Sequence, residues 1–281
     1  MEFVNLTTLY YYLQSRKVRL AFVPQWTSLV KKYTGYGPSL APKTILEFMK
    51  QNGNVLLALS GESGTPSAIS SLLLELDIHI SPDKSTLTVD HFNYDTISAS
   101  EKHDVLLLPR PGSSRSDLKS YFGGEGVIAF PKPIAQSLGN SSPLIASILK
   151  AKKTAYSYNP KEEIEASEDP FATGEQISLV TAMQSRNSAR FTVFVSLEAL
   201  ENQWFEAQVQ ANNGKKTATA NRAFAQQVTE WTFLETGVVK VGKIEHYLVE
   251  PSKKSKDKSL QRVGDLNPKI YRVKNDVVSS L

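Results

Sequence analysis

A series of short apolar runs, separated by segments with helical spacing, constrains the fold of this chain more than any other feature. The runs cover residues 18–23, 54–60, 86–90, 104–109, 126–130, 177–183 and 190–196. Runs such as VLLAL and VLLL do not alternate with polar residues, which is typical of strands covered on both faces by helices. The order of strands and helices therefore predicts an α/β fold with three layers and a mostly parallel sheet.

Helix start signals lie between these runs. Pro42 precedes apolar residues at helical spacing, and Asn52-Gly53 supplies a stop. Thr65 offers an N-cap and Pro66 a first helical position, ahead of an apolar stripe at i, i+3, i+4 and i+7. Further helices are expected over 144–149, after Ser142-Pro143, and over 197–210 and 220–236.

Composition excludes several classes of protein. The 281 residues are 41% hydrophobic, which is enough for a real core, and they include no cysteine. A disulfide, a thiolate nucleophile and a cysteine-ligated zinc or iron-sulfur site are thereby excluded. The net charge of +4 comes largely from a lysine-rich stretch near the C-terminus, so nucleic acid is a poor candidate partner.

The two ends of the chain give expectations about domains and membranes. The opening residues do not form a good signal peptide, and nowhere do about eighteen apolar residues run together. The sequence as written is therefore expected to be soluble. The tract PSKKSKDKSLQ looks like a solvated linker. We expect an α/β domain over 1–250, and a lysine-rich linker with the start of a truncated β-rich domain over 251–281.

The segment NVLLALSGESGTPSAI combines a strand, a glycine-serine loop and a helix, which is how phosphate-binding loops and nucleophile elbows are built. It lacks the lysine of a P-loop and the spacing of a dinucleotide fingerprint, and Ser63 has no evident base. A plain tight turn, with glycines for backbone freedom, is the favoured interpretation.

The stretch VDHFNYD places five polar residues just past the end of a predicted strand: Asp90, His91, Asn93, Tyr94 and Asp95. Open α/β sheets hold their ligands at such positions. Catalysis would also need a nucleophile or a metal, and the same residues can fix a loop through backbone hydrogen bonds. A structural or interface role is favoured over catalysis.

The stretch SRNSAR contributes Arg186, Asn187 and Arg190 between two apolar runs. These arginines could clamp an anion or a carboxylate, or they could belong to a hairpin and pair with local acids. The hairpin is favoured. His79, His103 and His246 show no metal-ligand spacing, and the glycosylation sequons at Asn5 and Asn140 matter only in the secretory pathway.

Several peptides together resemble one known family: NGNVLLALS, LLLELDI, VDHFNYD, MQSRNSARFTVFVSLEAL and NRAFAQQVTEWTFLETGVVKVGKIEHY. The family is the non-catalytic forty-eight kilodalton, wheat-germ-agglutinin-binding subunit of the oligosaccharyltransferase. The resemblance runs in register from about residue 40 to the end of the chain. It implies an amidotransferase-like α/β domain on the lumenal side of the endoplasmic reticulum membrane, with neither catalytic residues nor cofactors of its own.

The resemblance also implies a function and partners. The family supports a separate catalytic subunit that transfers an oligosaccharide from dolichyl diphosphate to asparagine in Asn-X-Ser/Thr, and it serves complex assembly and stability. The amidotransferase nucleophile is a cysteine, which this chain lacks. Family proteins also have a signal peptide, a complete first strand-helix-strand and a membrane helix. This chain is therefore expected to be a truncated form, with membrane association through segments outside it.

Two alternatives from other classes stay open. One is an amidotransferase-like hydrolase that uses Ser63 as nucleophile and His91 with Asp90 or Asp95 as base, which requires Ser63 and His91 within hydrogen-bond reach. The other is a carbohydrate-binding module with Tyr94, Trp204 or Trp231 as stacking platforms.

Overall fold

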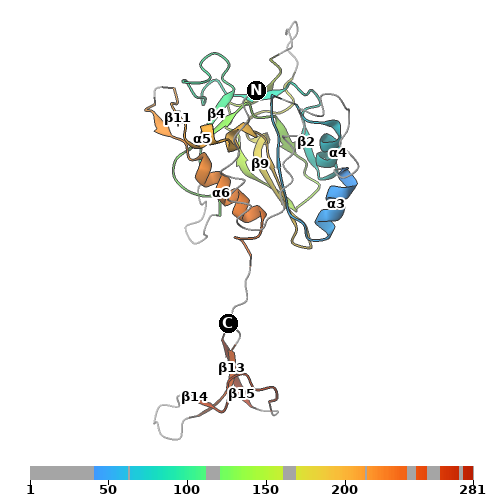
Figure 1. Cartoon of the computed structure of the whole chain (residues 1–281), viewed down its shortest axis with the longest axis vertical. Coiled ribbons are helices and arrows are strands. Elements are labelled where there is room, and N and C mark those ends of the chain that lie inside the picture. Colours follow the sequence, from blue (N-terminus) through green and yellow to red (C-terminus); the bar gives the residue numbers. More distant parts are fainter. Residues whose placement is uncertain are drawn as a thin grey trace. The chain divides into compact units, whose positions relative to one another are not determined.

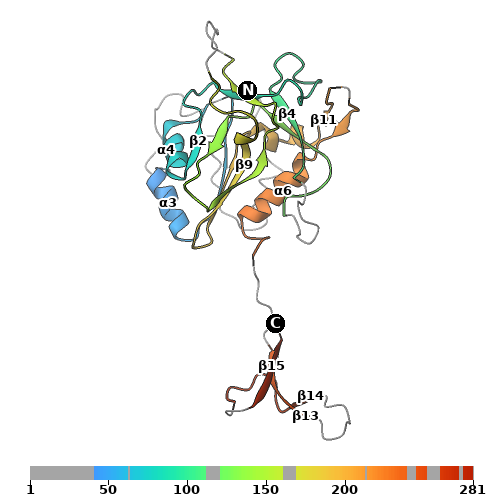
Figure 2. The same cartoon turned by 180° about the vertical axis from the view of Figure 1, so that it is seen from behind.

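The computed structural model describes most of the chain as two compact units, Met1–Thr236 and Gly237–Leu281 (Figures 1 and 2). The described residues are 41–62, 64–111, 121–160, 169–212, 214–238, 245–251, 260–271 and 275–280. The apolar run at 18–23 and the sequon at Asn5 lie outside them. Among the described helices, none is long and apolar enough to cross a membrane.

Two helices follow the predicted start signals. Helix α3 (Pro42–Lys50) begins at its proline and ends before Asn52, which takes the left-handed conformation with φ 65°. Helix α4 (Ser67–Glu75) has Pro66 as its N-cap, one residue later than predicted. Thr65 therefore lies outside the helix and does not cap it, contrary to the sequence-based expectation.

A four-stranded sheet forms the centre of the larger unit. Its strand order is β1 (Val55–Ala58), β10 (Arg190–Phe194), β9 (Ser178–Gln184) and β7 (Ile145–Lys150). Strands β1 and β10 are parallel, with Val55 opposite Phe191, whereas β9 runs antiparallel to both of its neighbours. Figure 1 shows α3 and α4 on one side of this sheet and α6 on the other, which agrees with helices covering a buried sheet.

The remaining strands of this unit form two-stranded ladders. They are β2 (Ile78–Ile80) with β6 (Gln136–Leu138), β3 (Leu87–Val89) with β8 (Tyr156–Tyr158), β4 (Val105–Pro109) with β5 (Val127–Pro131), and β11 (Gln208–Val209) with β12 (Thr217–Ala218).

The mixed α/β class is confirmed, but the prediction of a mostly parallel sheet is wrong for the described strands. Only the β1–β10 ladder among them is parallel. Non-alternating apolar runs report burial on both faces of a strand, and an antiparallel strand buried on both faces produces the same pattern.

The segment predicted as a helix over 144–149 is strand β7. It pairs with β9 from Ile145 opposite Met183 to Lys150 opposite Ser178, with a shift of register between Ser147 and Leu149. This irregularity disrupts the strict alternation of a strand, so the apolar spacing imitates that of a helix. The segment forms a strand because its backbone pairs with β9.

The predicted helix over 197–210 is also wrong. The segment contains the short helix η4 (Glu198–Leu200), the short helix α5 (Asn202–Phe205) and strand β11. Glu201 interrupts it with extended backbone at φ −83° and ψ 153°. The predicted helix over 220–236 is confirmed as α6 (Asn221–Thr232), and a further short helix, η3, spans Gly174–Gln176.

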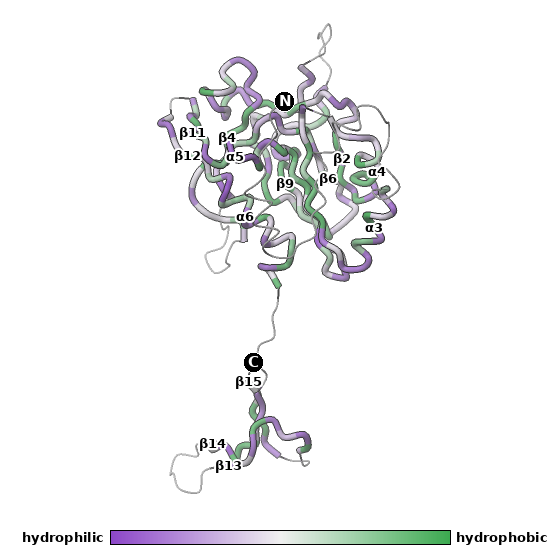
Figure 3. The backbone as a smooth tube through the Cα atoms, in the orientation of Figure 1, coloured by the Kyte–Doolittle hydropathy of each residue, from purple (hydrophilic) through white to green (hydrophobic). Residues whose placement is uncertain are grey.

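The core of the larger unit joins the sheet to its helices. Phe194 of β10 stacks on Phe130 of β5 with ring centroids 5.2 Å apart, and it lies 6.0 Å from Phe224 of α6. All three rings are fully buried. Figure 3 shows hydrophobic residues concentrated along the central strands and hydrophilic residues at the outer loops.

The smaller unit contains β13 (Glu245–Pro251), β14 (Leu260–Val263) and β15 (Asp276–Ser280) in the order β14-β13-β15, all antiparallel. The compact units divide between Thr236 and Gly237, and the domains expected over 1–250 and 251–281 stay a prediction. Strand β13 belongs to the second unit because it pairs there with both neighbours. The origin of this unit in a larger β-rich domain stays a prediction.

Candidate functional site

Asp90, the first acid of VDHFNYD, is 2% exposed and fixes the loop that follows β3. Its Oδ1 accepts hydrogen bonds from the amides of Phe92 (2.8 Å) and Asn93 (3.1 Å). Its Oδ2 accepts from Asn93 Nδ2 (2.9 Å) and Thr154 Oγ1 (2.8 Å). The carboxylate is thus occupied by four donors, two of them from its own loop backbone.

Asp95, the second acid, is also buried and ties the far end of the loop. Its Oδ2 accepts from the amide and the hydroxyl of Ser98, at 3.0 and 2.5 Å. Its Oδ1 accepts from the amide of Gln210 at 2.8 Å, which joins the loop to the end of β11.

His91 and Phe92 are the exposed residues of this loop, and Tyr94 is half-buried. His91 is exposed, and its Nε2 lies 2.8 Å from the hydroxyl of Tyr156. Tyr94 stacks on the ring of His103 with centroids 3.9 Å apart, and His103 also contacts His91. Asn93 Oδ1 accepts from Lys152 Nζ at 2.6 Å. The described partners of these residues belong to neighbouring loops and strands.

The stretch SRNSAR is the turn of the β9–β10 hairpin, as its structural interpretation predicted. Arg186 is exposed at the tip. Asn187 Nδ2 donates to the carbonyls of Met49 (2.8 Å) and Lys50 (3.2 Å), so it binds the C-terminal end of α3. This position satisfies helix carbonyls that have no intrahelical partner.

Arg190 is 1% exposed at the start of β10. Its Nη1 donates to the carbonyl of Trp231 in the last turn of α6 and to that of Thr236 at 2.8 Å. Its guanidinium carbon lies 4.4 Å from the centre of the Trp231 ring. A cation at a helix C-terminus is favoured by the helix dipole.

The two predicted sets of site residues are not brought together. Because β1 and β10 are parallel, the hairpin lies at their amino-terminal ends. VDHFNYD follows β3, which pairs with β8 outside the four-stranded sheet. The described hydrogen-bond partners of the two sets have no residue in common.

A different group of residues occupies the C-terminal ends of the parallel pair. Ser60 follows β1 and donates from Oγ to Glu198 Oε1, which follows β10, at 2.5 Å. Glu198 is 9% exposed, and its Oε2 has no hydrogen-bond partner among the described residues. Glu62 accepts from Lys132 Nζ at 2.5 Å at the exposed rim.

Burial shifts the pKa of two carboxyl groups here, those of Glu198 and the nearby Glu201. It raises the pKa of the Glu198 carboxyl, against the hydrogen bond from Ser60. Burial, together with the charges of Glu198 and Glu62, raises the pKa of Glu201 to about 7. Glu201 can therefore hold and exchange a proton near neutral pH. A cavity of about 350 Å³ lies beside Glu198, lined by Glu62, Lys132, Glu198 and Trp204 among others.

Sequence reasoning missed this group because Glu198 was assigned to an ordinary first helical turn. The available signal was an acid only four residues after the last residue of a buried strand, Phe194. Within the described residues, no three His, Asp or Glu side chains are arranged to hold a metal ion.

The alternative hypotheses receive no specific support from this geometry. Ser63, the nucleophile of the hydrolase alternative, lies outside the described residues, so its proximity to His91 stays a prediction. Trp204 is buried against the small apolar cluster of β4 and β5. Trp231 packs between Arg190 and Phe122, whose ring centroid is 5.9 Å away. Both tryptophans serve packing here.

Comparison with known proteins identifies relatives. The sequence model of the family described as "OST48, N-terminal domain" matches residues 28–235. A relative from Danio rerio, "Dolichyl-diphosphooligosaccharide--protein glycosyltransferase 48 kDa subunit", is 31% identical over 227 residues, 77% of this chain and 48% of its own. A Schizosaccharomyces pombe relative, "Dolichyl-diphosphooligosaccharide--protein glycosyltransferase subunit wbp1", is 28% identical over 82% of this chain and 49% of its own.

A solved structure titled "mmIFT52 N-terminal domain" is 15% identical, with a TM-score of 0.44 over 71% of this chain and 72% of that chain. This likeness is too weak to support a fold assignment. The chain spans about half the length of the curated relatives it matches.

Proposed function

The chain belongs to the OST48 family, through the N-terminal domain that matches residues 28–235, and from this premise we propose that it acts in protein N-glycosylation. Its role is that of a non-catalytic subunit of the oligosaccharyltransferase, the complex that transfers a dolichyl-diphosphate-linked oligosaccharide to Asn-X-Ser/Thr. It contributes to the assembly and stability of that complex. The observation that carries the proposal is the family match, together with relatives named as subunits of this glycosyltransferase.

The non-catalytic role is supported by chemistry. Amidotransferases of the fold that the family implies use a cysteine nucleophile, and this chain has none. The buried acids Asp90 and Asp95 are occupied by loop amides and hydroxyls. An amidotransferase-like fold without its nucleophile is suited to holding partners.

The partners under this proposal are the other subunits of the complex, including the catalytic one. The domain lies on the lumenal side of the endoplasmic reticulum membrane, and segments outside this chain associate with the membrane. Asp90, Asn93, Asp95, Asn187 and Arg190 hold loops and helix ends in place. The exposed His91 and Arg186, with Tyr94 and the neighbouring Phe92, are available for subunit contacts. Phe92 is 70% exposed, so its ring is accessible to a partner surface.

Co-purification from solubilised membranes tests the proposal. The tagged full-length gene product is expected to bring down the catalytic subunit. A clean preparation without that subunit would contradict the proposed membership.

Phe92→Ser tests the contact role of the loop, because it removes an exposed ring without touching the Asp90 hydrogen bonds. It is expected to reduce recovery of partners, whereas Leu144→Ser, at another exposed apolar side chain, leaves recovery unchanged.

A further inference from the structure

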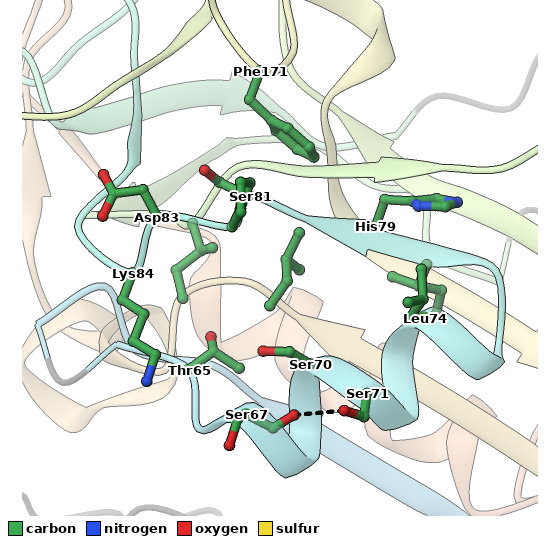
Figure 4. Close-up of a pocket in the computed structure, with 14 residues that line it drawn as sticks. Thr65, Ser67, Ser70, Ser71, Leu74, His79, Ser81, Asp83, Lys84 and Phe171 are labelled. Carbon is green, nitrogen blue, oxygen red and sulfur yellow. Dashed lines mark hydrogen bonds between the residues drawn. The ribbon is translucent and has the colours of Figure 1, made fainter.

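The loop that links β1 to α4 borders a cavity that the proposed function does not use. The cavity has a volume of about 400 Å³ and lies between α4, β2 and residues 81–84 (Figure 4). One part of its wall carries hydroxyl groups and a lysine. The other part is apolar, and its lining includes Leu74, Ile78, Ile134 and Phe171.

The amino-terminal end of α4, whose first residue Ser67 lines this cavity, has unused hydrogen-bond donors. The helix has nine residues and no side-chain cap, because its N-cap is Pro66. Its first hydrogen bonds run from the amides of Ile69 and Ser70 to the carbonyl of Pro66, each at 3.0 Å. The preceding amides, of Ser67 and Ala68, have no acceptor in the described part of the chain. Such amides and the positive end of the helix dipole favour an anion.

Thr65 gives an independent indication of a ligand. It is 5% exposed, and its hydroxyl has no hydrogen-bond partner among the residues described. Leaving a buried hydroxyl unpaired is unfavourable, so such a group calls for an explanation. Thr65 lines the cavity, and Figure 4 shows its hydroxyl directed into that space.

Lys84 supplies the positive charge. Its side chain lies along the loop at Gly64, where an added Cβ would stand 3.2 Å from Lys84 Cβ, and Gly64 has φ +67°. The Lys84 ammonium forms no ion pair with any described residue. The neighbouring Asp83 carboxylate already accepts from the Ser85 amide (3.1 Å) and the Thr86 hydroxyl (3.2 Å). Figure 4 shows it pointing away from the Lys84 ammonium.

The apolar wall completes the description of the ligand. Phe171 and Leu74 both line the cavity, yet they remain 38% and 60% exposed. Exposed large apolar side chains gathered at one cavity suit an apolar or aromatic body bound beside the anion. The glycine-serine loop lacks the lysine of a phosphate-binding motif in sequence, and the fold brings Lys84 to it from another segment.

We propose that this cavity binds a phosphate monoester with an apolar or aromatic body. The phosphate oxygens accept hydrogen bonds from the α4 amides, the Thr65 hydroxyl and the Lys84 ammonium. Donors from a helix end, a loop and a second loop surround a tetrahedral oxyanion better than a planar carboxylate. The body of the ester lies against Phe171 and the neighbouring isoleucines.

Calorimetric titration of the full chain with phenyl phosphate tests the site, with inorganic phosphate as the second probe. Phenyl phosphate is expected to bind saturably and more tightly than inorganic phosphate. Equal affinity for the two probes would overturn the role of the apolar wall. Absence of binding by either would overturn the site.

Two variants assign the binding to the named groups. Lys84→Met keeps the aliphatic stem and is expected to weaken phenyl phosphate binding by about tenfold or more, through loss of a charge-assisted hydrogen bond. Thr65→Val is expected to weaken it by about threefold to tenfold, since one hydrogen bond is lost. Thr65→Val should not lower the melting temperature, because the hydroxyl it removes has no partner in the free protein.

Lys216→Met is the matched control, at an exposed lysine between β11 and β12. It should leave the affinity unchanged. An equal loss in Lys216→Met and Lys84→Met would show general attraction to a basic protein and would overturn the assignment. Unchanged binding by both Lys84→Met and Thr65→Val would do the same.

Discussion

Asp90 and His91 are adjacent in the sequence and have opposite environments. The Asp90 side chain is buried with four hydrogen bonds, whereas His91 stands exposed beside Tyr156. A polar cluster after a strand can therefore contain one residue that builds the loop and another that faces outward. The buried member bears on stability, and the exposed member is the one available to a partner.

Substitution of the two residues should separate these roles. Asp90→Ala leaves loop amides and the Thr154 hydroxyl without their acceptor, so the free energy of unfolding should fall by about 2–4 kcal/mol. His91→Ala should change it by less than about 0.5 kcal/mol, as is usual at exposed positions. Urea denaturation followed by circular dichroism measures both. A larger loss in His91→Ala than in Asp90→Ala would contradict this division.

At the scale of elements, one arginine joins the central sheet to its covering helix. Arg190 starts β10, and its guanidinium binds backbone carbonyls at and beyond the C-terminal end of α6. The Trp231 ring packs against the same group. The contact fixes the end of the helix against the start of the strand, far along the chain from the residue that makes it.

Arg190→Met should preserve volume while removing the donors to the Trp231 and Thr236 carbonyls. We expect a loss of about 2–4 kcal/mol in the free energy of unfolding, because the charge-assisted hydrogen bonds and the contact of the guanidinium with the Trp231 ring are lost. Arg190→Lys should recover only part of it, since a single ammonium replaces the guanidinium fork. Arg186→Met, at the exposed tip of the same hairpin, is the control and should be nearly neutral. Equal effects of Arg186→Met and Arg190→Met would refute the anchoring role.

At the scale of the whole molecule, carboxylates from separate segments meet where β1 and β10 end. Glu62 follows β1, and Glu198 and Glu201 follow β10. Their proximity couples the stability of the fold to pH. A carboxyl whose pKa is raised on folding binds its proton more tightly in the native state, so the native state is favoured while that proton is bound.

The sign of the pH dependence follows from the pKa of Glu201, raised from 4.5 to about 7. Its contribution to stability is fully present below about pH 4.5 and is lost as the pH rises toward 7. Glu201→Gln mimics the protonated carboxyl, so it should lose less stability than the unmodified protein between pH 5 and pH 8. The difference should be about 1 kcal/mol after discounting for solvent screening. Urea titrations at each pH measure it.

Glu175→Gln, at an exposed carboxylate, is the control and should keep the pH dependence of the unmodified protein. A Glu201→Gln protein with the same pH dependence as the Glu175→Gln protein would show that Glu201 titrates normally.

The sequence by itself determined the features that depend on local pattern. Pro42 with an apolar stripe specified α3, the buried runs specified β1, β4, β5, β9 and β10, and the peptide blocks specified the family. Short-range spacing and residue type report burial and helix starts directly, whether or not the partner segment is known.

Only the tertiary structure decided three features: the direction of the strands, the formation of strand β7 in place of a helix, and the residues that make up the sites. A buried strand shows the same apolar pattern whether it runs parallel or antiparallel to its neighbours. In β7, the shift of register against β9 lets a strand accommodate an apolar spacing that is typical of a helix. Glu198 came to lie beside Ser60, and Lys84 beside the Gly64 loop, because distant segments were folded together. Such contacts are set by packing across the molecule, and no local window of sequence contains both partners.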